Sequence, residues 1–432
     1  MTPTTATIHV ICVGDELLRG DTTNTNLADL GQLLERHGLA VADEQCVPDD
    51  HDAILRALRH AAHDAANAHD GEPESAVILV GGLGPTSDDL TRPVTAEFLG
   101  RALQPSPAVR QAILDHLGDR ADRLPPDALD TQSLVPEGAD VLPNPNGTAP
   151  GLALRTPRTL FALLPGPPRE CLPMAEQSLV PLLTRLDGAR PTPTLELRAC
   201  CLPESQAEAF VRQAIRQTDG AEGRIRLATC IKPDAIVLRL ARTDRHDDRD
   251  GLLPKLRDAA ARLLGPRLLP DGCASAAAYL GRLLAERGLA MATAESCTGG
   301  LIAARLTDVP GSSEWFLGAT VTYANAWKER LLGVADQTLR QHGAVSEPTV
   351  HQMLDGLHDR WGADAGVAVS GIAGPGGGTP EKPVGTVVVG AFAPGWRHVT
   401  TLHLHGSRQT IRQRSAAACI QLLIRGLLRL EP

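Results

Sequence analysis

The chain has 432 residues, of which 43 % are hydrophobic and 22 % charged, and its formal net charge is −9. Since one hydrophobic core stops growing near 250–300 residues, we expect two or three domains. The negative charge supplies no general attraction to phosphate backbones, which argues against nucleic acid as a partner. No apolar run approaches the ~20 residues of a membrane helix, and Met1–Val10 lacks a secretory signal, so we expect a cytoplasmic protein without a membrane partner.

Short β-rich runs alternate with helical patterns over the first 185 residues, and this order predicts a parallel α/β sheet. The expected elements are a strand at Thr7–Val13, a helix at Asn26–His37, a strand at Leu39–Cys46, a helix at Asp52–Ala68, strands at Ala76–Val80, Val141–Leu142, Leu152–Leu154 and Leu160–Leu164, and a helix at Pro168–Leu183.

The order of elements changes after Pro191–Pro193, which predicts a small α+β module ending at Pro266, Pro270 and Gly272. Its expected elements are a strand at Leu195–Leu202, a helix at Glu204–Arg216, strands at Ile225–Ile231 and Ala235–Leu240, and a helix at Leu252–Leu264.

The α/β rhythm returns from Ser275, so the chain is expected to contain three domains, 1–187, 188–271 and 272–432. In the last of these the expected helices are Tyr279–Arg287, Gly299–Thr307, Pro348–Trp361 and Gln409–Leu430. The expected strands are Leu289–Ala294, Phe316–Thr322, Ala365–Ser370, Gly385–Phe392 and Val399–His405.

The first chemical motif, Glu295–Gly300, directly follows the strand Leu289–Ala294. A strand-to-helix turn here predicts that Ser296 lies at a helix N-terminus, where free N–H groups can hold a phosphate or an oxyanion. The simpler interpretation is that Ser296 or Thr298 only caps the helix while the two glycines permit tight packing. Cys297 is a rival nucleophile, but no His/Asn partner set for it lies near these motifs.

The second motif, Val321–Lys328, also follows a strand and opens a helix. Lysine is scarce in this chain, with only Lys232, Lys255 and Lys382 besides Lys328. A desolvated lysine can take the proton of a serine hydroxyl, and Tyr323 could relay that proton or orient the ammonium. The alternatives are ordinary surface positions, or a core position for Tyr323.

Two further elements of this domain lie where a ligand is expected. The glycine-rich loop Ser370–Gly378 leaves a strand, and such loops form the ligand crevice of open α/β sheets. Arg408 and Arg412 stand one turn apart at the start of the last helix and offer two guanidinium groups for a phosphate. Alternatively, both arginines are solvated charges.

A glycine turn with acidic residues, Gly81–Thr91, follows a strand of the first domain. Consecutive glycines can expose N–H groups to phosphate, and the neighbouring Asp88 and Asp89 could hold a divalent cation. The competing interpretation is a turn followed by acidic helix-capping residues. Further loops of the same sheet edge contain Gly14–Leu18, Asn24–Asn26, Asn144–Gly151 and Leu164–Pro168.

The C-terminal motifs, together with His342–Ser346 and Lys382–Thr386, resemble the CinA C-terminal domain, a nicotinamide-nucleotide amidase family. The resemblance implies deamidation of nicotinamide mononucleotide (NMN) without a metal or other cofactor. It implies Ser296 as nucleophile with Lys328 and Tyr323 as activating groups. The substrate-binding residues it implies are Glu295, Cys297, Thr298, Gly299, Gly300, Asn325, Ser370, Gly371, Gly374, Arg408 and Arg412.

The first domain is similar to the CinA N-terminal domain, which is related to molybdopterin-binding folds and in some members hydrolyses ADP-ribose. The resemblance implies a divalent metal (Mg, Mn or Co) held by Asp88 and Asp89. The ligand-binding residues it implies are Gly14, Glu16, Asn24, Gly81, Gly82, Gly84, Thr86, Asn146, Gly147, Thr148, Pro165 and Gly166.

The middle module resembles the KH-like insert of full-length CinA proteins. Its Gly220–Gly223 segment fits a G-x-x-G loop, but Glu222 is unsuited to nucleic acid, so a spacer or a surface for a homodimer is expected. Two alternatives to an enzyme of pyridine-nucleotide salvage stay open. One is a molybdopterin-binding or transfer protein, and the other is a non-catalytic partner in competence or DNA-damage responses.

Overall fold

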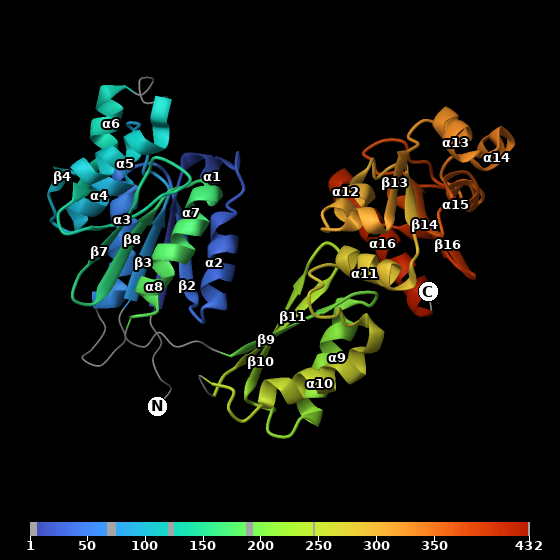
Figure 1. Cartoon of the computed structure of the whole chain (residues 1–432), viewed down its shortest axis with the longest axis horizontal. Coiled ribbons are helices and arrows are strands. Elements are labelled where there is room, and N and C mark those ends of the chain that lie inside the picture. The colour runs from blue at the N-terminus through green and yellow to red at the C-terminus, as the bar shows by residue number, and fades with distance from the viewer. Residues whose placement is uncertain (1–6, 67–74, 120–124, 187–192, 245–246, 431–432) are drawn as a thin grey trace. The chain divides into compact units, whose positions relative to one another are not determined.

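The computed structural model describes residues 7–66, 75–119, 125–186, 193–244 and 247–430. Its contacts divide the chain into two compact units, Met1–Pro193 and Thr194–Pro432 (Figure 1). The expected boundary at 187/188 lies outside the described residues, and the three-domain division stays a prediction. No helix in the described part of the chain is both long and apolar enough to cross a membrane.

The first unit is built on a six-stranded sheet with the strand order β2-β1-β3-β8-β7-β6. Its strands are β1 (Thr7–Val13), β2 (Val41–Val47), β3 (Ser75–Val80), β6 (Asp140–Leu142), β7 (Gly151–Arg155) and β8 (Thr159–Leu164). The predicted parallel pairing is confirmed for β2, β1, β3 and β8 and is wrong for β7 and β6. Only residues 156–158 join β7 to β8, which is far too short for a parallel crossover.

Helices cover both faces of this sheet. The helices α2 (Asn26–Arg36) and α7 (Pro168–Met174) pack on one face, and α3 (His51–Ala66) and α4 (Thr91–Phe98) pack on the other. The remaining helices are α1 (Asp15–Arg19), α5 (Pro107–Leu117), α6 (Pro126–Gln132), the π-helical turn η2 (Ala175–Leu179) and α8 (Val180–Leu183). The strands β4 (Leu103–Pro105) and β5 (Leu134–Pro136) form a separate ribbon.

Two predictions for these helices need correction. The sequence patterns predict one helix over Pro168–Leu183, but η2 interrupts it, and Pro173 and Pro181 remove backbone donors there. The sequence patterns also predict no helices in the region of α4, α5 and α6, where the structure has three. The expected end of the helix Asp52–Ala68 falls on residues 67–68, which lie outside the described residues.

The second unit begins with the predicted α+β module, whose three-stranded antiparallel sheet has the order β10-β11-β9. Its elements are β9 (Thr194–Ala199), α9 (Glu204–Gln217), β10 (Ile225–Ile231), β11 (Ile236–Arg242), α10 (Leu252–Leu264) and the short η3 (Gly265–Arg267). Apolar residues of α9 and α10 pack on one face of the sheet and form a core of its own.

The C-terminal domain has a five-stranded sheet with the order β13-β12-β14-β15-β16. Its strands are β12 (Met291–Glu295), β13 (Phe316–Val321), β14 (Ala365–Gly371), β15 (Thr386–Ala393) and β16 (Trp396–His403). The strands β12, β13 and β14 are parallel, whereas β15 and β16 are antiparallel. The carboxyl ends of β12, β13 and β14 therefore meet at one edge, which positions the motifs that follow them.

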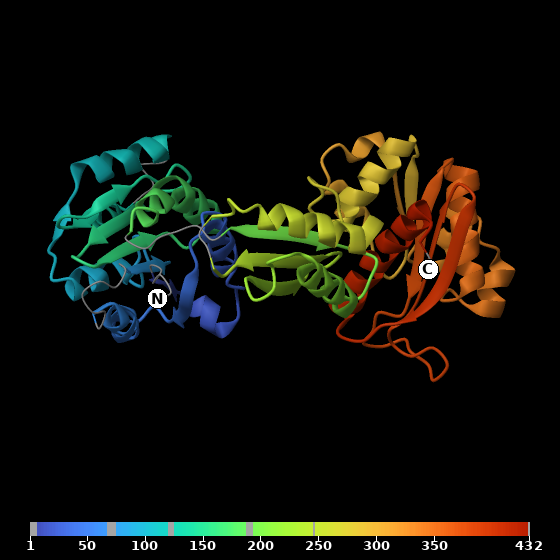
Figure 2. The same ribbon diagram turned by 90° about the horizontal axis from the view of Figure 1, so that it is seen from below.

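The helices of this domain are α11 (Ala276–Arg287), α12 (Leu301–Thr307), η4 (Ser312–Glu314), α13 (Asn325–Leu332), α14 (Asp336–His342), α15 (Glu347–Trp361) and α16 (Arg408–Leu428). Apolar residues of α11, α12 and α16 cover one face of the sheet, and those of α13 and α15 cover the other. Figure 2 shows the long red helix α16 lying against the strands.

The α+β module and the C-terminal domain share packing at the far end of α16. Cys200, Cys201 and Leu269 belong to the same buried cluster as residues of α11 and α16. The Arg425 guanidinium donates to the Cys201 carbonyl at 3.1 Å, and Gln421 Nε2 donates to the Asp234 carbonyl at 3.3 Å.

Candidate active site and nucleotide cavity

Ser296 is the first residue after β12 and is 9 % exposed. Its N–H donates to the Val369 carbonyl of β14 at 3.1 Å, which ties the turn to the neighbouring strand. The prediction that Ser296 lies at a helix N-terminus is wrong, because α12 begins only at Leu301. The backbone donors at the start of α12 are instead bound by the carboxylate of Glu295, a fully buried side chain.

Lys328 lies on α13, behind the carboxyl end of β13, and is 1 % exposed. Its Nζ is 3.3 Å from Ser296 Oγ, 2.7 Å from the Thr322 carbonyl and 3.4 Å from the Tyr323 carbonyl. Among the described residues no carboxylate makes an ion pair with it. Burial lowers the pKa of the Lys328 ammonium below its ordinary value, with a smaller opposing effect of Cys297. This shift favours the neutral amine, which is the form that can accept a proton.

Cys297 stands beside Ser296 but belongs to the buried apolar cluster of the domain. A Cβ on Gly371 would come 3.1 Å from its Sγ, so the thiol packs against the end of β14. Burial raises the pKa of the Cys297 thiol to about 11. Since the thiolate is the nucleophilic form, this environment disfavours the cysteine alternative.

Tyr323 is 62 % exposed, and its hydroxyl accepts a hydrogen bond from Arg408 Nη2 at 3.2 Å. Within the described structure its phenol has no hydrogen bond with Lys328 or Ser296, so only its backbone carbonyl contacts the lysine. Arg408 also donates to the Gly374 carbonyl at 2.6 Å, and Arg412 donates to the Thr298 carbonyl at 2.7 Å. Both guanidinium groups therefore lie against the predicted loops.

The structure brings the other predicted residues of this site to the same edge of the sheet. Ser370 is buried at the end of β14, and Gly371 follows it. Asn325 is exposed at the first position of α13. Gly299 and Gly300 have φ angles of 62° and 93°, conformations that residues with a Cβ rarely adopt. The substrate contacts of all these residues stay predictions.

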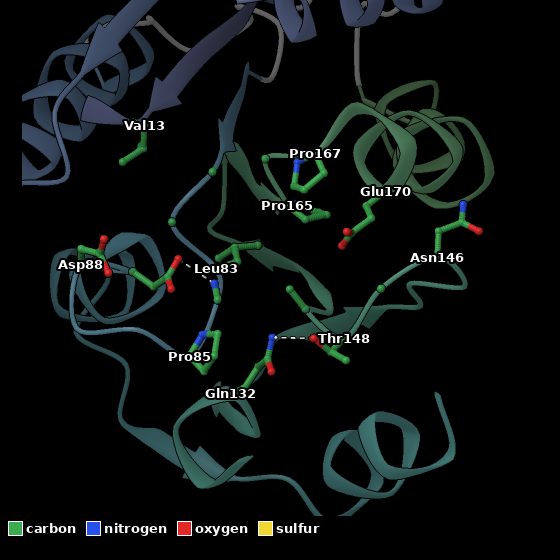
Figure 3. Close-up of a pocket in the computed structure, with 18 of the residues that line it drawn as sticks. Val13, Leu83, Pro85, Asp88, Gln132, Asn146, Thr148, Pro165, Pro167 and Glu170 are labelled. Carbon is green, nitrogen blue, oxygen red and sulfur yellow. Dashed lines mark hydrogen bonds between the residues drawn. The ribbon is translucent and has the colours of Figure 1, made fainter. Parts of the chain in front are cut away.

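The first unit contains a cavity of about 530 Å³ at the carboxyl ends of its parallel strands (Figure 3). All the predicted ligand-binding residues of this unit line it except Asn24 and Thr86. Asn24 Nδ2 instead donates to Glu44 Oε1 on β2 at 2.6 Å. Gly147 leaves room for Glu170, since a Cβ there would lie 2.0 Å from Glu170 Oε2.

The two carboxylates predicted to bind a metal lie in different environments. Asp89 accepts hydrogen bonds from the Gly84 and Thr86 N–H groups, both at 2.8 Å, and thereby closes the glycine turn. Asp88 is exposed, and a hydrogen bond from Thr86 lowers the pKa of its carboxyl. No group of three or more His, Cys, Asp or Glu residues in the described ranges is arranged to hold a metal ion. A cation at Asp88 would need substrate oxygens to complete its coordination, which is a common arrangement for Mg²⁺.

Residues 274–427 match the family "CinA C-terminal domain", and residues 9–185 match the family "Probable molybdopterin binding domain". A CinA-like protein from Akkermansia muciniphila is 39 % identical over 421 residues, which cover 96 % of each chain. A CinA-like protein from Geobacter sulfurreducens is 38 % identical over 427 residues, covering 98 % of this chain and 99 % of that protein. The chain belongs to the CinA family.

A solved structure also matches part of the chain. The competence/damage inducible protein CihA from Agrobacterium tumefaciens shares 42 % sequence identity, with a TM-score of 0.34, and the match covers 34 % of this chain and 92 % of that one. Family membership confirms both domain resemblances and the α/β fold class inferred from the sequence motifs.

Sequence reasoning missed several residues of the N-terminal cavity. Asp49 lines it, and its N–H and carboxylate exchange hydrogen bonds with Asp15 at 3.3 and 2.9 Å. Its place two residues after β2, at the carboxyl end of a parallel strand, was the available signal. Gln132 lines the cavity from α6. The buried Arg92 of α4 does not line it but donates to the carbonyls of Leu83, a lining residue, and Thr131 at 2.7 and 2.9 Å. Both Gln132 and Arg92 lie in the segment for which no elements were predicted.

Proposed function

We propose that the C-terminal domain hydrolyses the carboxamide of nicotinamide mononucleotide to nicotinic acid mononucleotide and ammonia. The observation that supports this most directly is the buried Lys328 Nζ, 3.3 Å from Ser296 Oγ and without an acidic partner among the described residues. A serine amidohydrolase needs a nucleophilic hydroxyl and a base that activates it, and this pair supplies both. The choice of substrate comes from the family resemblance.

In the proposed reaction Ser296 Oγ attacks the amide carbon while Lys328 Nζ takes the hydroxyl proton. The lysine returns that proton to the departing nitrogen, ammonia leaves, and an acyl ester on Ser296 remains. Water, deprotonated by the same lysine, then hydrolyses the ester and releases the carboxylate. The guanidinium groups of Arg408 and Arg412 are suited to bind the phosphate of the nucleotide, with Tyr323 held beside Arg408.

For the N-terminal domain we infer metal-dependent hydrolysis of the pyrophosphate of ADP-ribose. The cavity of about 530 Å³ is large enough for such a ligand, and the glycine turn supports phosphate binding. Among the described residues the Gly82 and Leu83 N–H groups have no hydrogen-bond acceptor. Asp88 is the carboxylate available for Mg²⁺, Mn²⁺ or Co²⁺, which would neutralise phosphate charge when bound.

The deciding experiment for the deamidase is ammonia release from NMN by the purified full-length chain without added metal. Turnover that disappears in Ser296→Ala supports the proposal. If the wild-type chain releases no ammonia, the result favours the two alternatives, a molybdopterin-binding or transfer protein and a non-catalytic partner in competence or DNA-damage responses. Sedimentation of the same preparation tests the expected homodimer.

A further inference from the structure

The side chain of Glu295 is fully buried, and its carboxyl oxygens accept hydrogen bonds from three backbone N–H groups of one turn. Oε2 accepts from the Gly300 N–H at 2.9 Å and from the Ile302 N–H at 3.2 Å, and Oε1 accepts from the Ala303 N–H at 2.9 Å. These are the donors at the start of α12 that a phosphate or oxyanion would otherwise use. These three N–H groups bind Glu295 and are therefore not available to a ligand.

The turn between Glu295 and α12 is fixed at further points. The Ser296 N–H donates to the Val369 carbonyl, and the Gly299 N–H donates to the Ser296 carbonyl at 3.1 Å. The Thr298 carbonyl accepts from Arg412 at 2.7 Å. These hydrogen bonds hold the turn on both sides of Ser296, whose hydroxyl lies beside Lys328.

Among the described residues the N–H group that follows the nucleophile, that of Cys297, has no acceptor outside its own residue. Cys297 is nevertheless only 5 % exposed, whereas Thr298, whose N–H also lacks an acceptor in the described part of the chain, is 0 % exposed and leaves no room there for a ligand atom. A buried, unpaired N–H is costly, and proteins keep such groups chiefly where a ligand or water completes them. Cys297 directly follows the nucleophile in the chain, which is where a donor to a developing oxyanion is useful.

We propose that Glu295 is a positioning residue that shapes this turn so that the N–H group of Cys297 stabilises the oxyanion formed when Ser296 attacks its substrate. The inference rests on the proposed function in that it takes Ser296 as the nucleophile, but it does not depend on which acyl substrate is cleaved. In the attack, the Ser296 Oγ–carbon bond forms, the carbonyl π pair moves onto oxygen, and the hydroxyl proton moves to Lys328. Glu295 takes no part in the proton transfer and touches no reacting atom.

The test is Glu295→Gln, which keeps size and shape but replaces one acceptor oxygen by an NH₂ donor. That NH₂ group must face at least one of the three N–H groups, so the turn cannot keep its hydrogen bonds. We expect kcat for NMN to fall by ~10² or more, the loss typical of removing oxyanion donors, while KM changes by less than about threefold. Glu295→Asp keeps the carboxyl group but shortens the side chain, so it should also lose hydrogen bonds to the turn. If Glu295→Gln does not fold, Glu295→Asp replaces it in the test, and the same fall in kcat with little change in KM is expected.

Ser275→Ala is the matched control. Ser275 Oγ accepts from the Ala278 N–H at 3.1 Å and caps α11, so this variant also loses a helix cap of the same domain without touching the site. It should lower the melting temperature and leave kcat near the wild-type value. Equal kcat losses in the two variants, or a Glu295→Gln variant that raises KM with normal kcat, would overturn the positioning role.

A probe that does not need the natural substrate separates this inference from the proposed function. An alkyl fluorophosphonate reacts with an activated serine by the same attack and places a phosphoryl oxygen where the oxyanion would lie. We expect the probe to label Ser296 of the wild-type chain, and the labelling rate of Ser296 in Glu295→Gln to be ~10²-fold lower. If the probe labels the wild-type chain but the chain does not turn over NMN, the assignment of NMN as substrate is wrong and the positioning role of Glu295 is unaffected. Equal labelling rates in both proteins, or no labelling of Ser296 in either, would overturn the positioning role.

Discussion

Lys328 and Ser296 are 32 residues apart in the chain, and the Nζ of one lies 3.3 Å from the Oγ of the other. They meet because β12 and β13 are parallel neighbours, so the segments that follow them emerge at the same edge of the sheet. The buried lysine binds backbone carbonyls instead of a carboxylate.

Ser296→Ala removes the attacking oxygen, and kcat for ammonia release from NMN should fall by ~10⁴–10⁶, as for deletion of other catalytic nucleophiles. Cys297→Ala should retain most of the rate, because the thiol packs in the apolar cluster and burial raises its pKa to about 11. An active Ser296→Ala variant would contradict the assignment of the nucleophile.

Lys328→Arg should be nearly inactive although it preserves the charge, because a guanidinium cannot accept the serine proton at working pH. If Lys328 only bound the phosphate, this variant would keep its kcat and change mainly KM. Measuring both constants for Lys328→Arg therefore separates the two roles.

The pH dependence of the wild-type rate follows from the same burial. Desolvation disfavours the ammonium form and lowers the pKa of Lys328, and only the neutral amine can accept a proton. The rate should therefore rise with pH, with a midpoint below the ordinary lysine value of 10.5. A profile that falls over this range would contradict the role of a neutral lysine as base.

Arg408→Ala and Arg412→Ala should each raise KM for NMN by ~10–100-fold, since a hydrogen bond to a charged group contributes ~1.5–3 kcal/mol. The effect should largely vanish with nicotinamide riboside, which lacks the phosphate. Arg414→Ala is the control on the same helix, because this exposed arginine donates only to the His405 carbonyl in the described structure. An equal effect on nucleotide and nucleoside would show that the arginines do not recognise phosphate.

Asp88→Ala should abolish the divalent-cation-dependent cleavage of ADP-ribose and leave NMN deamidation intact, because the two sites lie in separate units. Asp21→Ala, which removes an exposed carboxylate that does not line the cavity, is the control. If the wild-type chain binds ADP-ribose but cleaves it with none of Mg²⁺, Mn²⁺ and Co²⁺, the N-terminal domain is a binding module.

A fragment covering residues 194–432 should retain full deamidase activity, and one covering 272–432 should be active but melt at a lower temperature. The shorter fragment exposes the surface of α11 and α16 that Cys200, Cys201 and Leu269 cover. Equal melting temperatures would show that the α+β module contributes nothing to the stability of the C-terminal domain.

The sequence predicted the elements whose periodicity is undisturbed. The strand Ile225–Ile231 and the helix Leu252–Leu264 have the bounds expected from their patterns. The region of α4, α5 and α6 was not predicted, because short helices interrupted by prolines and a two-stranded ribbon carry little periodic signal. The antiparallel strand β7 could have been recognised from its short connection to β8.

The pairing of Ser296 with Lys328 was predictable, since both follow strands whose carboxyl ends share an edge. The role of Glu295 was not, because its three partners are backbone groups five to eight residues further along the chain. A glutamate at the end of a strand looks the same in sequence whether it faces a ligand or caps a helix, and only tertiary packing decides between them.

The two ends of α16 contact different parts of the structure. Arg408 and Arg412 near its start reach the loops of the active site, and Gln421 and Arg425 near its end hold the α+β module. Because a helix turns about 100° per residue, inserting a single residue between Arg412 and Gln421 would rotate one pair relative to the other by that angle. Changes of length in the middle of α16 should therefore be tolerated far less than changes of residue type, even at positions that touch neither the substrate nor the module.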